Sequence, residues 1–349
     1  MNKTSSFPTF PSDCKSLLSK YLTKEVFEEL KDKKTASSFT LNQAIASGVQ
    51  NSDSGIGVYA GDIESYSTFS SLFDPIIEDY HGFTKSDSHI SNLNPDDLNA
   101  PNPDPENKYI ISTRIRVGRN IANLPLGPAI SQEERNDVEN QASKALEALE
   151  GNLKGNYYPL DGMSEEISQK LISDHFLFKA GDRFLEAAGL NRQWPIGRGI
   201  FHNVEKTFLV WVNEEDQLRI ISMQEGGDIK EVFQRLTKAI SKLEEKIEFS
   251  YNKHLGYITS CPTNLGTAMR ASVHIKVPNL SKDYSKFEEI TNNYHLQIRG
   301  INGEHSESVG GVYDISNKRR LGVTEVQCVQ DMYDGVVELI RVEKLLENK

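Results

Sequence analysis

The segment Cys261-Pro262-Thr263-Asn264-Leu265-Gly266-Thr267-Ala268-Met269-Arg270 joins a thiol, a proline turn, a glycine bend and an arginine in one short stretch. The residues that follow, Ala271-Ser272-Val273-His274-Ile275-Lys276-Val277, alternate between apolar and polar side chains. Alternation with a period of two is typical of a half-buried strand. We therefore expect a turn that leads into a strand with a polar face suited to an anionic ligand. That face would carry Arg270, Ser272, His274 and Lys276.

The same reasoning predicts further strands and long helices around this segment. A strand from Tyr109 to Val117 would place Arg114 and Arg116 on one face, because side chains two residues apart in a strand point the same way. A hairpin is predicted between residues 208–212 and 218–223. Helices are predicted after Ser131, where Glu134 completes a capping box, after Asp228, and from about Gln330 to Glu347. Hairpins mixed with long helices favour an α+β domain over residues 109–349, with a mainly antiparallel sheet flanked by helices.

The N-terminal part has a different pattern. Residues 12–83 show apolar side chains at helical spacing in short stretches, which predicts a small all-helical domain over residues 1–90. We expect a glycine-rich loop, neither helix nor regular strand, over residues 47–59. Serine, asparagine, aspartate and proline dominate residues 84–108, and we place a linker at residues 91–108.

Bulk composition excludes several classes of function. The net charge of −11, from 39 Lys+Arg and 50 Asp+Glu, argues against nucleic acid or an anionic membrane as a partner. Three cysteines without a CxxC motif argue against a disulfide framework and a zinc site. No apolar run approaches the roughly 18–20 residues that span a bilayer. We expect a cytoplasmic protein with no dedicated metal site and no obligate protein partner.

Nucleotide binding would have to use an unusual site. The chain has no GxxxxGK[ST] motif and none of the protein-kinase motifs. Guanidinium groups offer an alternative, because they are planar, permanently charged and bidentate toward phosphate. Taken singly, an arginine is more often a surface ion-pair partner. The arginines on or beside predicted strands are Arg114, Arg116, Arg219, Arg270 and Arg299.

The run Cys261-Pro262-Thr263-Asn264-Leu265-Gly266-Thr267 resembles the signature of the phosphagen (guanidino) kinases. The resemblance covers most of the chain and extends to Trp194-Pro195-Ile196-Gly197-Arg198-Gly199 and to Trp211. It implies reversible transfer of the γ-phosphoryl group of ATP to a guanidine, with Mg²⁺ carried as MgATP and MgADP. In that family, arginines at the positions of the five above clamp the nucleotide phosphates. His175 and His274 match family histidines near the adenine, although either one alone would more often be structural.

The resemblance also points to two carboxylates, Glu215 and Glu304. Carboxylates suit a guanidine because they accept its N–H groups and can take its proton. Without the resemblance, each would be read as an acid in a solvated turn or loop. The loop that carries Glu304 has Ile301-Asn302 where many family members have Thr-Arg, a change that bears on how the loop contacts nucleotide.

Cys261 could be a covalent nucleophile, but direct in-line transfer needs no covalent intermediate. A thiolate beside arginines should have a lowered pKa. We therefore expect Cys261 to help hold the cationic guanidine, which is also the role that the resemblance implies.

The segment Ser54-Gly55-Ile56-Gly57-Val58-Tyr59 bears on which guanidine is the substrate. Small residues let backbone N–H groups approach a carboxylate, and Tyr59 can add a hydroxyl. The segment is similar to that of family members that use L-arginine, where it holds the amino-acid end of the substrate. Those members also pair an acid at Asp53 with an arginine at Arg183 across the two domains.

We therefore expect L-arginine and ATP to interconvert with phosphoarginine and ADP, for energy buffering. Two alternatives stay open, and a third is disfavoured. The acceptor could be taurocyamine, lombricine or creatine. The chain could be a non-catalytic nucleotide-binding homologue. Phosphorylation of arginine in proteins is disfavoured by the presence of residues 1–90.

Overall fold

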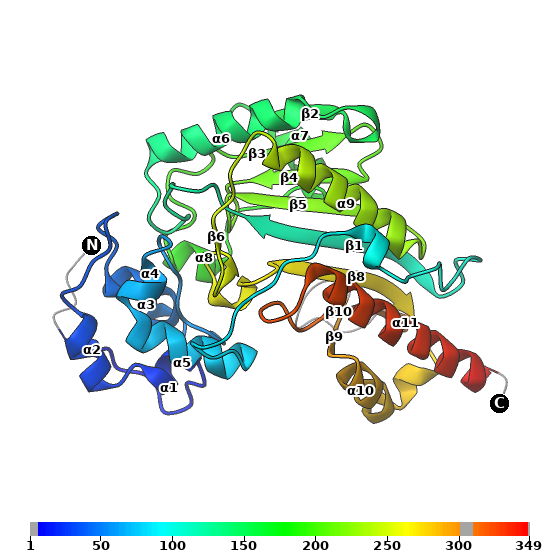
Figure 1. Ribbon diagram of the computed structural model, residues 1–349, viewed down its shortest axis with the longest axis horizontal. Helices are drawn as coiled ribbons and strands as arrows, with labels where there is room; N and C mark the ends of the chain where they lie inside the picture. Colours follow the sequence, from blue (N-terminus) through cyan, green and yellow to red (C-terminus); the bar gives the residue numbers. More distant parts are fainter. Residues whose placement is uncertain (1–5, 301–309, 348–349) are drawn as a thin grey trace.

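The structure, a computed structural model, describes residues 6–300 and 310–347 (Figure 1). Within them, eight strands form one sheet in the order β2-β3-β4-β5-β1-β8-β10-β9. Every neighbouring pair is antiparallel, which confirms the predicted sheet type. The strands are β1 Ile110–Arg119, β2 Gly155–Pro159, β3 Gly199–Asn203, β4 Phe208–Val212, β5 Leu218–Glu225, β8 Met269–Lys276, β9 Leu296–Gly300 and β10 Val312–Asn317.

Long helices cover one face of this sheet (Figure 1). Helix α9 packs on β5 and β1, and α11 packs on β8 and β10. The residues between them form the main core and include Ile115, Val117, Ala271, Val273 and Ile315. Their alternate neighbours along each strand must point to the opposite face. The helices of this part are α6 Gln132–Glu147, α7 Glu165–Ser173, α8 Arg183–Ala187, α9 Ile229–Glu244, α10 Tyr284–Asn293 and α11 Glu325–Glu347.

Helix starts follow the capping signals. Ser131 and Glu134 form the predicted reciprocal capping box of α6, and Asp228 caps α9 through the amide of Glu231. Helix α11 begins earlier than expected. Thr324 accepts a hydrogen bond from the amide of Gln327, whose side chain accepts from the amide of Thr324. This Thr-x-x-Gln capping signal at residues 324–327 precedes the predicted start at about Gln330.

The N-terminal helices share a core with the signature segment. Their buried side chains, such as Leu18 and Phe73, belong to one cluster with Ile258, Cys261 and Leu265. The helical character predicted for this part is confirmed. The predicted loop over 47–59 is wrong at its start, because the first four of these residues complete α3. The helices are α1 Leu17–Tyr21, α2 Lys24–Leu30, α3 Leu41–Gln50, α4 Ser65–Thr68 and α5 Ser70–His81.

The segment predicted as a linker is packed against the C-terminal helix. Ser91 Oγ and the amide of Asn92 donate to the carboxylate of Glu325, at 2.8–3.0 Å. Leu98 and Ala100 are buried in the main core. The connection therefore has a defined path along α11. Among the described residues, no helix combines the length and the apolar character that a membrane span requires.

Gly48 allows α3 to approach the glycine-rich segment closely. A Cβ at this position would lie 2.5 Å from both Cα and O of Gly57 and 2.7 Å from Cδ2 of Leu18. We expect Gly48→Ala to destabilise the protein by about 1–3 kcal/mol, because neither the Gly57 backbone nor the buried Leu18 side chain can move away without strain. Urea denaturation measures this. Gly55→Ala is the control, since its Cβ would have no neighbour within 4 Å. Equal stability of both variants would contradict the prediction.

Candidate active site

Strand register gathers four arginines on the face of the sheet opposite α9 and α11. Arg116 of β1 lies opposite Arg270 of β8, and Arg114 lies opposite Ser272. On β5, Arg219 lies opposite Gly118 of β1. Directly opposite residues share a face, and so do residues two apart along a strand. Arg114, Arg116, Arg219 and Arg270, far apart in the sequence, therefore form one cationic surface, named here the arginine face.

The guanidinium groups of the arginine face are close enough to repel one another. Burial lowers the pKa of Arg114 to about 10, and the charges of Arg219 and Arg270 contribute. Burial, followed by Arg219, Arg114 and Arg270, also lowers the pKa of Arg116 well below its usual value. Cations held together against this repulsion suit a ligand with several negative charges.

Strands β10 and β9 extend this face. Asp314 of β10 lies opposite His274 of β8 on one side and Arg299 of β9 on the other. Its carboxylate accepts a hydrogen bond of 2.7 Å from Arg270 Nη2 and lies 3.4 Å from His274 Nε2. Asp314 was not among the predicted site residues. One acid in a short strand carries no signal of its own, and only the register reveals its neighbours.

His175 lies in the turn after α7, with a left-handed φ of 61°. The carbonyl of the next residue, Phe176, accepts a hydrogen bond of 2.7 Å from Trp211 Nε1. The guanidinium carbons of Arg114 and Arg219 lie 5.6 Å and 5.5 Å from the Trp211 ring. Trp211 thus ties the turn of His175 to one end of the arginine face.

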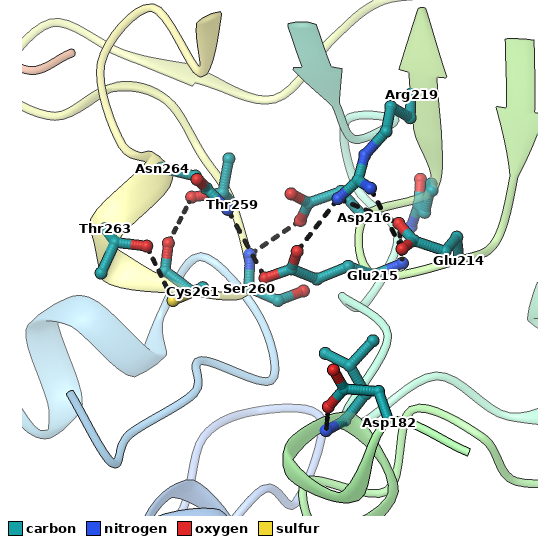
Figure 2. Close-up of polar contacts among 12 residues, drawn as sticks. Asp182, Glu214, Glu215, Asp216, Arg219, Thr259, Ser260, Cys261, Thr263 and Asn264 are labelled. Carbon is teal, nitrogen blue, oxygen red and sulfur yellow. Dashed lines mark hydrogen bonds and ion pairs between the residues drawn. The ribbon is translucent and has the colours of Figure 1, made fainter. Parts of the chain in front are cut away.

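Glu215 lies in the turn between β4 and β5, next to the signature segment (Figure 2). Its Oε2 accepts from Arg219 Nη2 at 3.1 Å, and its Oε1 lies 3.5 Å from Asn264 Nδ2. The adjacent Asp216 accepts from the amide of Ser260 at 2.8 Å and from Asn120 Nδ2 at 2.9 Å. These bonds place the Glu215 carboxylate beside Cys261 and at the edge of the arginine face.

The environment of Glu215 raises its pKa to about 7. Burial is the main cause and the charge of Asp216 adds to it, while Arg219 opposes the rise. A carboxylate with a pKa near neutrality can accept a proton more readily than an ordinary glutamate. Such perturbation is common at catalytic sites.

The expectation of a lowered pKa at Cys261 is wrong for the chain without ligands. Burial, followed by the charge of Glu215, raises the pKa of the thiol to about 12. The charged groups that contribute to this shift in the pKa of the thiol are carboxylates rather than arginines. Sγ lies 3.0 Å from Thr263 Oγ1. A guanidinium cation bound between Glu215 and Cys261 would act in the opposite direction, because opposite charge favours the thiolate.

The segment from Ser54 to Tyr59 lies against the same site. The amide of Ala60 donates to the Ser260 carbonyl at 2.7 Å, which joins the segment to the residue before Cys261. Burial raises the pKa of Tyr59, and the charges of Cys261 and Glu215 contribute. Among the described residues, no hydrogen bond is found from the amides of Gly55, Ile56 and Gly57.

Asp53 and Arg183 form a bidentate ion pair between the N-terminal helical part and α8. Arg183 Nη1 also donates to Asn51 Oδ1 at 3.0 Å. Ser47 Oγ adds a bond of 2.9 Å to the carbonyl of Phe184. The remaining predicted residue, Glu304, lies outside the described residues, as do Ile301 and Asn302.

Comparison with known proteins decides the family. Residues 137–346 match the ATP:guanido phosphotransferase C-terminal catalytic domain, and residues 12–78 match the N-terminal domain of the same family. The chain belongs to the ATP:guanido phosphotransferase family.

Its relatives include the arginine kinase Met e 2 of Metapenaeus ensis, 58% identical over 95% of this chain and 94% of the relative. The arginine kinase of Artemia franciscana is 56% identical over the same shares of the two chains. Among solved structures, a lombricine kinase superposes with a TM-score of 0.93 at 41% identity, over 99% of this chain and 96% of that one. A duplicated taurocyamine kinase of Schistosoma mansoni gives 0.89 at 43% identity, over 95% of this chain and 47% of that one.

The pKa of Glu215 predicts the pH dependence of this phosphotransferase. Protonated Glu215 cannot accept a proton from the guanidine, so kcat/KM should fall about tenfold per pH unit below the pKa of about 7. Initial rates of phosphorylation between pH 5.5 and 9 measure the profile. Glu215→Gln should lower kcat and abolish this limb. A wild-type profile that is flat down to pH 5.5 would rule out Glu215 as the proton acceptor.

Proposed function

We propose that this chain is an arginine kinase, which reversibly transfers the γ-phosphoryl group of ATP to the guanidino group of L-arginine. The products are phosphoarginine and ADP, and the role is energy buffering. One observation carries the proposal: Glu215 sits between the arginine face and the signature segment. Relatives named arginine kinase at 56–58% identity over about 95% of the chain support the choice of L-arginine.

The arginine face would hold the nucleotide phosphates. Phosphoryl transfer asks the protein mainly to position the reactants and to neutralise charge on the group in transit. Arg114, Arg116, Arg219 and Arg270 supply that charge, and Arg299 extends it on β9. His175 and His274 would flank the adenine. Phosphate groups would also relieve the mutual repulsion of the arginines. This relief of electrostatic repulsion would make nucleotide binding more favourable.

Magnesium is proposed as part of the nucleotide substrate, MgATP or MgADP. Across residues 6–300 and 310–347, no group of three histidine, cysteine or acidic side chains is arranged to hold a metal ion. Mg²⁺ is commonly bound through substrate phosphates and water rather than by a protein cage. The chemistry that it supplies is neutralisation of phosphate charge.

Glu215 would orient the guanidine and accept its proton at a carboxylate oxygen. A second carboxylate, Glu304, is proposed for the same role. Cys261 would stabilise the guanidinium cation before transfer, as a thiolate when the cation is present. The amides of residues 55–57 and the hydroxyl of Tyr59 would bind the carboxylate of L-arginine.

Further proposals concern the setting of the reaction. Closure of the N-terminal helical part over the site would keep ATP from water. We propose a cytoplasmic protein that needs no obligate protein partner and binds neither nucleic acid nor membrane. The net charge of −11 and three free cysteines are consistent with this setting.

A panel of guanidines tests the substrate assignment. We expect kcat/KM for L-arginine to exceed that for taurocyamine, lombricine and creatine by at least about 100-fold. Taurocyamine carries a sulfonate in place of the carboxylate, and lombricine and creatine hold their carboxylate at a different distance from the guanidine, so none of them would pair with the amides of residues 55–57 as L-arginine would. An ADP-coupled assay measures the rates. A preference for another guanidine would reassign the acceptor. ADP binding without turnover of any guanidine would favour a non-catalytic homologue.

The pair of Asp53 and Arg183 is expected to favour the substrate-bound arrangement. Asp53→Asn should raise KM for L-arginine several-fold while the dissociation constant of ADP changes by less than about twofold, since the pair joins α8 to the segment after α3 and lies on none of the strands of the arginine face. The control is Glu338→Gln, which removes a bidentate pair with Arg341 within α11. The proposed role of the Asp53–Arg183 pair is disproved if both variants keep the wild-type KM for L-arginine.

A further inference from the structure

Arg198, the residue just before β3, has no assigned role in the site described above. Its side chain is completely buried. Its Nε donates to the carbonyl of Asn213 at 3.1 Å, and its Nη1 donates to that of Ile196 at 3.0 Å. Its Nη2 donates to the carbonyls of Leu190 at 2.8 Å and Arg192 at 3.0 Å. One guanidinium group therefore joins its own loop to the turn that carries Glu215.

A side chain of the turn also forms hydrogen bonds to the loop that carries Arg198. Asn213, the first residue after β4, has a left-handed φ of 58° and stands two residues before Glu215. Its Nδ2 donates to the carbonyl of Gly197 at 2.7 Å and to that of Arg135 at 3.1 Å. Arg198 and Asn213 thus form a reciprocal clamp, in which each side chain bonds to backbone on the other side.

The bonds of Arg198 favour a positional role over charge pairing. All its acceptors are backbone carbonyls, and the charged groups that affect it are the cations Arg135 and Arg192. Burial and these two cations lower the pKa of Arg198 to about 9. Burying a cation beside other cations costs free energy. Arg198 therefore stabilises this region through the planar set of N–H donors of its guanidinium group and not through its charge. Lysine cannot reproduce that planar set.

We propose that Arg198 is a positioning residue that fixes the β4–β5 turn and thereby the carboxylate of Glu215. The proposal rests on the function proposed above, in which Glu215 orients the guanidine. Displacement of a reacting group by about 1 Å can cost about 100-fold in rate. Three of the four arginines of the arginine face lie on β1 and β8, whose pairing does not involve Arg198, and only Arg219 follows the turn, on β5. The effect should therefore fall on the transfer step rather than on nucleotide binding.

The first test compares Arg198→Lys with Arg192→Lys. Arg192 is a neighbouring, partly buried arginine that donates to the carbonyls of Gly127 and Ile130 but not to the turn. We expect Arg198→Lys to lower kcat with L-arginine by about 10–100-fold and to leave the dissociation constant of ADP within about twofold. Arg192→Lys should keep wild-type kcat. An unchanged kcat in Arg198→Lys, or an equal loss in the control, would overturn the proposal.

The second test does not depend on activity. Hydrogen–deuterium exchange of the amides of residues 213–217 should accelerate in Arg198→Lys and not in Arg192→Lys. Asn213→Asp, which replaces the donor group of the clamp by an acceptor, should accelerate exchange and lower kcat even where Arg198→Lys fails to fold. Unchanged exchange and kcat in the variants that fold would refute the clamp. Absence of turnover in the wild type would instead refute the proposed function, and exchange would still decide the role of Arg198.

Discussion

Repulsion among buried guanidinium groups is the constraint around which this site is arranged. The chain carries a net charge of −11, yet β1, β5 and β8 concentrate four arginines on one face of a sheet. Carboxylates at the rim offset part of the repulsion: Glu214 and Glu215 contact Arg219, and Asp314 contacts Arg270. A polyphosphate would take over that role for the inner arginines, which is why the face suits a nucleotide.

The second requirement is a fixed placement of this face relative to Glu215 and Cys261, the residues proposed to bind the guanidine. The stretch from Thr259 to Pro262, where the signature segment begins, provides it, because this stretch bonds to both parts of the molecule. On the sheet side, the Ser260 amide donates to Asp216 of the β4–β5 turn. On the helical side, Tyr66 Oη donates to the Thr259 carbonyl at 2.7 Å, and His81 Nε2 lies 2.9 Å from the Pro262 carbonyl. Cys261 contributes to this junction through its place in the shared core.

Local patterns predicted much of the fold because each has a short-range cause. Alternation marked β1 and β8, and capping residues marked the starts of α6 and α9. The small strand β2 and the pairing of β10 with β9 have little local signal and escaped prediction. The lowered pKa expected for Cys261 was wrong because folding buries the thiol and places Glu215 close to it, and neither effect can be read from the residues next to Cys261 in the sequence.

By itself, the sequence determined the family, the antiparallel sheet and the residue types available for chemistry, because the signature and the periodic patterns are contiguous. Only the tertiary structure decided which of these residues act together. Register placed Arg116 opposite Arg270 and Asp314 between His274 and Arg299, and packing raised the pKa of Glu215. Only the tertiary structure shows the clamp between Arg198 and Asn213, because its hydrogen bonds go to backbone carbonyls and leave no pattern in the sequence. Distances and burial depend on contacts between remote segments, and those exist only once the chain has folded.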